Sequence, residues 1–75
     1  MKYINNMSKP AITIPSTQKR EIEKYLDDLA LDREACETWE EEWPIRQAIH
    51  GVMDILGILG YWVDEKSGHF TIGRD

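Results

Sequence analysis

The sequence predicts a small α+β domain with three helices, a C-terminal β-hairpin and an N-terminal arm that could contribute a short strand. Apolar residues recur at helical spacing through the middle of the chain, and two β-prone segments flank a turn-like stretch near its end. The 75 residues, 41% hydrophobic and 31% charged, suit one globular domain. We expect residues 1–15 to form the arm and residues 16–75 the helical core with its hairpin.

The first helix is expected from Thr17 to Ala30. Its apolar residues fall at i, i+3, i+4, i+7 and i+8, which places them in one stripe on the helix: Ile22, Tyr25, Leu26, Leu29 and Ala30. Ser16 or Thr17 can cap its start. Before it, "AITIP" alternates Ile12 and Ile14 with threonine between two prolines, which suits a short edge strand.

A second, short helix is expected over the stretch "EACETWEEEWP", with Asp32 as its N-cap. Its apolar side chains span only part of the circumference and should face inward: Ala35, Cys36, Trp39 and Trp43. Pro44 disfavours helical geometry at the residue before it, so this helix should end near Glu42.

A third helix should then start at Pro44, which suits the first helical position, and end at Gly60. Its wide apolar stripe runs from Ile45 to Leu59, and Ile58 falls off that stripe and should be partly exposed or at an interface. Gly51 and Gly57 weaken a helix, and a close approach of two helices is one reason for such glycines.

The C-terminal segment predicts a hairpin in which "YWV" and "HFTI" are strands separated by "DEKSG". Tyr61 and Val63 should share one face, with Trp62 on the other. Phe70 and Ile72 should alternate with polar neighbours. A lone hairpin is unstable in water, so one face must pack on the helices.

Charge is distributed unevenly along the chain, whose net charge is −5. Residues 1–20 carry four cations and no acid, whereas residues 21–42 carry ten acids against Lys24 and Arg33. An acidic segment repels phosphate and attracts basic surfaces. We therefore expect an acidic partner-binding face made of five glutamates: Glu34, Glu37, Glu40, Glu41 and Glu42.

The residue pattern gives no sign of catalysis, a cofactor or a metal. Cys36, His50, Asp54 and His69 lack the close Cys or His pair of a structural zinc site, and no phosphate-binding glycine loop is present. We expect a non-enzymatic protein with an inert cysteine. No apolar run reaches membrane-spanning length and no signal peptide is evident, which favours the cytoplasm.

The stretch "LGILGYWVDEKSGHFTIG", Leu56 to Gly73, resembles the end of the recognition helix and the wing of winged-helix transcription regulators. The resemblance covers 18 of 75 residues, and the predicted order of three helices before a hairpin agrees with it. It implies DNA binding through six polar residues: Arg46, Gln47, His50, Lys66, His69 and Arg74. Few of them are Lys or Arg, whereas neutralising phosphates needs several cations together.

The leading functional hypothesis is a regulator or inhibitor, of the nucleic-acid-mimic type, that presents its acidic face to a basic protein surface. Its size suits an accessory protein of a bacterium or mobile element. One alternative is a winged-helix DNA-binding regulator. Another is a homodimerising structural module that uses Ile58 or Trp62, because exposed large apolar residues favour association.

Overall fold

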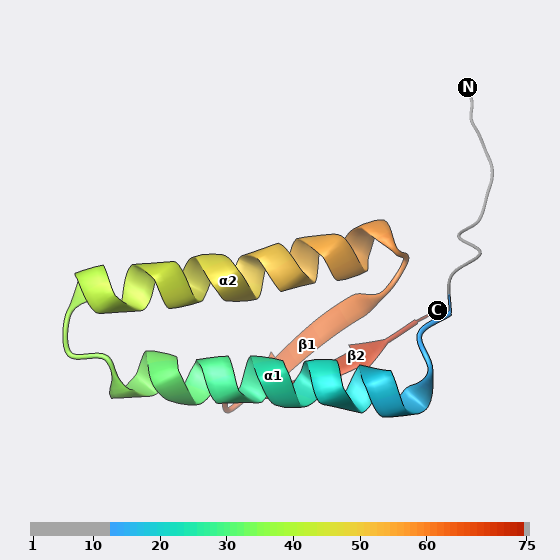
Figure 1. Cartoon of the computed structure of the whole chain (residues 1–75), viewed down its shortest axis with the longest axis horizontal. Coiled ribbons are helices and arrows are strands. Elements are labelled where there is room, and N and C mark those ends of the chain that lie inside the picture. Colours follow the sequence, from blue (N-terminus) through green and yellow to red (C-terminus); the bar gives the residue numbers. More distant parts are fainter. Residues whose placement is uncertain (1–12, 75) are drawn as a thin grey trace, which may run out of the picture.

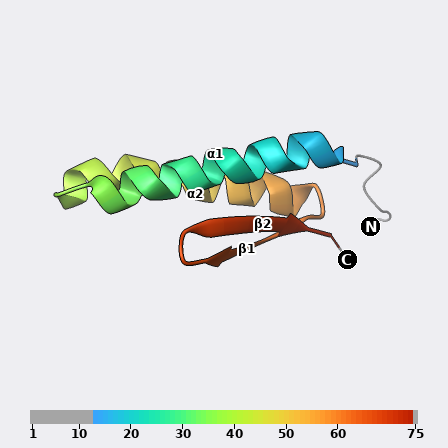
Figure 2. The ribbon, with the colours of Figure 1, turned by 90° about the horizontal axis from the view of Figure 1, so that it is seen from below.

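The computed structural model describes residues 13–74, which form two helices followed by an antiparallel β-hairpin. Helices α1 (Ser16–Ala35) and α2 (Trp39–Ile58) lie antiparallel, side by side (Figure 1). Strands β1 (Trp62–Lys66) and β2 (His69–Gly73) form a second layer on one face of the helices (Figure 2). The α+β class and the hairpin are confirmed, and the expectation of three helices is wrong.

Helix α1 is longer than predicted, because it continues past Ala30 to Ala35. Arg33 in its last turn favours the negative end of the helix dipole and pairs with Glu65 of β1 at 2.7 Å. The predicted serine or threonine cap is wrong: Pro15 precedes the helix, and its carbonyl accepts from the Lys19 N–H at 2.9 Å. The predicted strand lies partly outside the described residues, and Thr13–Pro15 are not in a strand.

The predicted second and third helices do not form as drawn, because α2 starts at Trp39 and contains Pro44. The Thr38 hydroxyl accepts from the Glu41 N–H at 3.2 Å, and the Glu41 carboxylate accepts from the Glu37 N–H at 3.1 Å. The Thr38 hydroxyl thus satisfies one of the donors that a helix start leaves free, and the Glu41 carboxylate reaches back to the N–H of the residue before the N-cap, an arrangement close to a capping box. Glu40, Glu41 and Glu42 also favour the positive end of the dipole. The start is therefore well stabilised, although Pro44 removes one backbone hydrogen bond in the second turn.

The core lies between the helical layer and the hairpin. Its buried side chains come from all four elements or their ends: Leu26, Ala30, Ile49, Leu56, Tyr61, Phe70 and Ile72. The predicted alternation is confirmed, because Tyr61 is buried, Val63 packs against the core and Trp62 is exposed. Helix α1 packs on β2, and α2 packs on β1.

The hairpin turn is only two residues long, Ser67 and Gly68, since Lys66 pairs with His69. Both turn residues have positive φ, 53° and 83°, as a type I′ turn requires. Asp64, Glu65 and Lys66 therefore belong to β1, not to a loop. The dipeptide Ser-Gly favours this turn, because glycine adopts a positive φ without strain.

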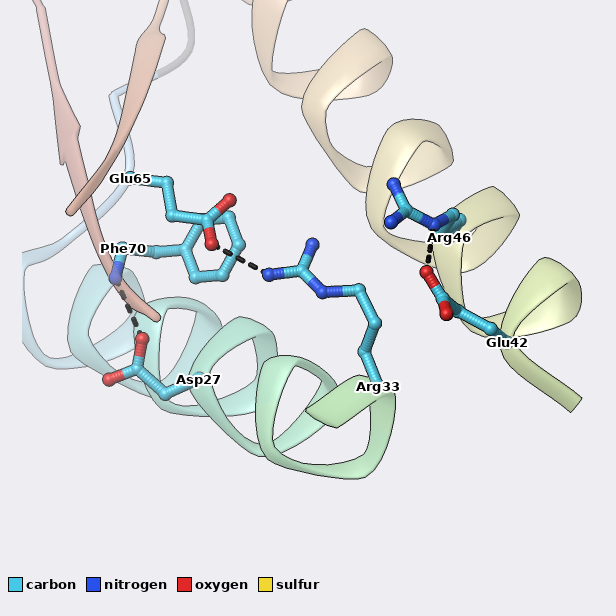
Figure 3. Close-up of polar contacts among 6 residues, drawn as sticks. All are labelled: Asp27, Arg33, Glu42, Arg46, Glu65 and Phe70. Carbon is cyan, nitrogen blue, oxygen red and sulfur yellow. Dashed lines mark hydrogen bonds and ion pairs between the residues drawn. The ribbon is translucent and has the colours of Figure 1, made fainter. Parts of the chain in front are cut away.

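The outer edge of β2 is closed by two carboxylates of α1. The Phe70 N–H donates to Asp27 Oδ1 at 2.7 Å (Figure 3), and the Ile72 N–H donates to Glu23 Oε2 at 2.8 Å. Glu23 and Asp27 are four residues apart and therefore share one side of the helix. They take the place that the carbonyls of a third strand would have at this edge.

The Tyr61 hydroxyl joins the two ends of the described chain. It accepts from the Ile14 N–H at 2.8 Å and from the Arg74 guanidinium at 3.1 Å, and that guanidinium lies 5.1 Å from the ring centroid. The hydrogen bond from Ile14, followed by those from Arg74 and its charge, lowers the pKa of the Tyr61 phenol despite an opposing effect of burial. The donors favour the phenolate.

The helical glycines have no packing role. A methyl group at Gly51 or Gly57 would meet no atom within 4 Å, so the proposed close helix approach is wrong. Gly73 differs, because a methyl group there would overlap the Trp62 ring, its cross-strand partner. The indole of Trp62 thus rests on Gly73.

Replacing Asp27 by alanine should lower the free energy of unfolding by about 1.5–3 kcal/mol, the range for a hydrogen bond to a charged group. Asp28→Ala is the control, since Asp28 is an exposed neighbour paired only with Lys24, and should cost about 0.5 kcal/mol or less. Urea unfolding followed by circular dichroism compares the two. Equal losses of unfolding free energy in the two variants would contradict a stabilising role for the hydrogen bond from Phe70 to Asp27.

Gly51→Ala and Gly57→Ala should each raise the free energy of unfolding by about 0.5–1 kcal/mol, because alanine loses less backbone entropy in a helix. Gly73→Ala should lower it, since the new methyl group displaces the Trp62 ring. Chemical denaturation of the three variants measures these signs. A loss at Gly51 and Gly57 would show a packing role that the open space does not reveal.

Tyr61 should ionise below the ordinary tyrosine pKa of about 10. Because the folded pKa is the lower one, the stabilisation from ionisation is absent below it. It grows as pH rises through the folded pKa and is complete above the unfolded value. Ultraviolet titration of the phenolate measures this step, which Tyr61→Phe should remove and Tyr25→Phe should leave. The same early step in both variants would contradict the assignment.

Candidate functional site

The end of the helical layer that carries the α1–α2 connection extends beyond the hairpin (Figure 2). We call this end the tip and define it by five exposed residues: Glu34, Glu37, Trp39, Glu40 and Trp43. They come from the last turn of α1, the connection and the first two turns of α2. The tip thus brings together acidic and aromatic side chains from two helices.

Trp39 and Trp43 are 57% and 49% exposed, so the expectation that they face inward is wrong. Ala35 is exposed as well, and Cys36 is partly buried. The reason is that α2 continues unbroken through Pro44, so the two tryptophans and the apolar stripe belong to one helix. Ile45 and Ile49 of that stripe pack on the core, and the tryptophans therefore lie on the outer side of α2.

The two indoles form a paired surface. Their ring centroids are 5.3 Å apart with the planes tilted by 46°, a separation at which aromatic pairs attract each other. The Arg46 guanidinium lies 5.9 Å from the Trp39 ring centroid and also pairs with Glu42 (Figure 3). Because the rings belong to one helix and lie next to each other, each restricts the rotamers open to the other.

The five predicted acidic residues gather at this end of the fold, although on two helices and their connection instead of one helical face. They divide into two groups. Glu41 completes the cap and Glu42 pairs with Arg46, so both have structural partners. Within residues 13–74, the carboxylates of Glu34, Glu37 and Glu40 make no hydrogen bond or ion pair with another side chain. These three remain available to a partner.

Cys36 lies in the connection, where its thiol donates to the Asp32 carbonyl at 3.2 Å. Partial burial, followed by the charges of Glu41, Glu42 and Asp32, raises the pKa of this thiol. A raised pKa lowers the thiolate fraction, and the thiolate is the reactive form. The position does not favour a nucleophile.

The residues of the alternative nucleic-acid-binding set are spread over the fold. Gln47 and His50 are exposed on α2, while Lys66 and His69 face each other beside the hairpin turn. His69 also lies 3.5 Å from an Asp27 carboxylate oxygen. Arg74 follows β2 at the opposite end of the hairpin, against Tyr61. Arg46 is engaged with Glu42 and Trp39, so the structure does not gather these six residues into one basic surface.

The exposed Ile58, at 81%, agrees with its predicted place off the apolar stripe. Trp62 is 46% exposed over Gly73, at a distance along the chain and in the fold from the tip. Among residues 13–74, no group of three or more His, Cys, Asp or Glu side chains is arranged to hold a metal ion. Neither helix of that part of the chain has the length and apolar character needed to cross a membrane.

The signal for the tip was present in "TWEE", Thr38 to Glu41, which has the spacing of a capping box. This spacing favours a helix start at Trp39, and a helix that continues from there through Pro44 turns both tryptophans outward. Pro44 also suits a helix start, so two signals compete in this stretch. Proline is tolerated near a helix start, and here it lies one turn further along than expected.

The order of three helices that supported the winged-helix resemblance is not found in residues 13–74, and the resembling stretch itself, Leu56 to Gly73, forms the end of α2 and the hairpin. No family model matches the chain, and no curated protein or solved structure shows a match to it.

Proposed function

We propose that this protein is a non-enzymatic interaction protein whose tip binds a basic surface on a protein partner, as a regulator or inhibitor would. The observation that carries the proposal is the exposed pair Trp39 and Trp43 among carboxylates that have no partner of their own. Large aromatic residues dominate the binding energy of many interfaces. Exposed apolar patches on a soluble protein favour aggregation, and they often mark a surface that binds another protein.

The glutamates of the tip also support the proposal. Glu34 and Glu37 precede the aromatic pair in the sequence and Glu40 lies between its two members, and none of the three pairs with another side chain within the described residues. Charges at the rim of an interface accelerate association with a surface of opposite sign and exclude surfaces of the same sign. An aromatic centre with an acidic rim therefore fits a basic partner, including one that otherwise binds a nucleic acid.

Two sets of variants test the proposal by quantitative affinity capture from the native host. Trp39→Ser with Trp43→Ser should reduce capture of the specific partner by about tenfold or more, the loss for removing interface anchors. Glu34→Lys with Glu37→Lys and Glu40→Lys should abolish it. Glu41 and Glu42 are left intact because they stabilise α2.

The control for charge is Asp54→Lys with Asp64→Lys, compared with Glu34→Lys with Glu40→Lys, so that each variant reverses two exposed acids. The control should leave capture unchanged, as should Trp62→Ser for the aromatic set. In a Trp62→Phe background all tryptophan emission comes from the tip, so binding of the purified partner should change that emission. A partner bound equally well by all variants would refute the tip as its site.

Duplex DNA distinguishes the alternative function. Under our proposal a gel shift at low salt should detect no binding, because an acidic surface repels phosphates. Binding that is lost on replacing Arg46 and Lys66 would favour the DNA-binding alternative and contradict the proposal.

A further inference from the structure

An apolar groove runs between α1 and α2, away from the tip. Its volume is about 480 Å³. It is lined by Ile14, Gln18, Glu21, Ile22, Tyr25, Val52, Ile55, Leu56 and Leu59. No hairpin residue is among them, so the groove opens on a side that the second layer does not cover.

Helix geometry agrees with this placement. Tyr25 lies two residues from both Glu23 and Asp27, and residues two apart on a helix point about 200° from each other. Glu23 and Asp27 contact β2, so Tyr25 faces away from the hairpin. Tyr25 is 53% exposed and Ile55 is 60% exposed, although both are large and line the groove.

The shape of the groove suits a helix. Two antiparallel helices leave a furrow between them that a third helix can fill, as in helical bundles and in proteins that bind a peptide helix. The lining from Gln18 to Tyr25 is about 10 Å long at 1.5 Å per residue, and that from Val52 to Leu59 is as long. Two turns of a partner helix would therefore be in contact with both walls.

The charges around the groove indicate what kind of partner helix it suits. Glu21 is the charged residue of the lining, and Asp32 recurs on the same edge of α1, eleven residues later. Asp28 lies between them but is paired with Lys24 at 3.2 Å. No Lys or Arg lines the groove in the described part of the chain. A second copy of this chain would therefore offer Glu21 no cation from its own groove.

We infer that this groove binds an amphipathic helix of a partner protein, with its apolar side on Tyr25, Val52 and Ile55 and with Lys or Arg flanking that side toward Glu21. The groove shares no residue with the tip. The inference therefore stands or falls separately from the proposed function, and a single partner could occupy both surfaces.

The test is an NMR titration of the full chain with a designed helical peptide of about fourteen residues, roughly 21 Å long, in which leucine forms one face and lysine the flanks. Binding should perturb Ile22, Tyr25, Val52, Ile55 and Leu59. A peptide of the same pattern with glutamate for lysine should not bind, and neither should a leucine–lysine peptide of scrambled order. Binding of either, or perturbation centred on Trp39 and Trp43, would overturn the inference.

Ile55→Lys and Ile58→Lys form a matched pair, since both exposed isoleucines belong to α2 but only Ile55 lines the groove. Ile55→Lys should weaken binding by about tenfold or more and Ile58→Lys by less than about twofold. Glu21→Gln, which leaves the apolar lining intact, should also weaken it. Equal effects of the two isoleucine variants would overturn the inference. So would self-association of the protein alone, seen by sedimentation and lost in Ile55→Lys, because a second copy would then be the occupant.

Discussion

The contact of Glu23 and Asp27 with the outer edge of β2 determines how the two layers of this protein are joined. A two-stranded hairpin has two open edges, and it is not stable in water without a surface to pack on. Here the buried Phe70 and Ile72 supply the apolar contact, and their own N–H groups donate to the two carboxylates. Side-chain packing and backbone hydrogen bonding therefore act at the same residues, which specifies both the strand's register and its distance from α1.

This arrangement has a consequence for the surfaces that remain open. The hairpin is five residues per strand, whereas each helix is twenty residues long. A strand of that length spans about 17 Å and a helix of twenty residues about 30 Å. The hairpin cannot cover the whole helical layer, and because it is docked near the start of α1, the uncovered end is the one with the α1–α2 connection (Figure 2). The groove and the α2 part of the tip lie where the second layer does not cover the helices, whereas Glu34 of the tip lies beside the hairpin turn.

The sequence predicted some of the features that depend on short-range periodicity, although Tyr25 and Ile55, both expected on apolar stripes, are exposed. The hairpin faces followed from the alternation of Phe70 and Ile72, and the exposure of Ile58 followed from helical spacing. The helix boundaries between residues 30 and 45 did not follow, because three signals compete there. Asp32 can cap a helix, Pro44 can start one, and Thr38 with Glu41 can form a capping box. In the fold, the cap at Thr38 marks the start of α2, and α1 continues past Asp32 to Ala35, with Arg33 of its last turn in contact with Glu65.

Prediction of the candidate site depended on the same helix boundary, the start of α2. An acidic face was predicted from composition, and the glutamates are indeed grouped, but their chemical roles could not be separated without knowing where α2 starts. The start at Trp39 assigns Glu41 to the cap and brings Glu42 within reach of Arg46 one turn later. It also turns Trp39 and Trp43 outward. Glu41 and Glu42 thus have structural roles in α2. The carboxylates of Glu34, Glu37 and Glu40 have no such role among the described residues. Those three carboxylates belong to the same end of the fold as two exposed indoles, which is why the proposed function rests on both groups and not on acidic composition alone.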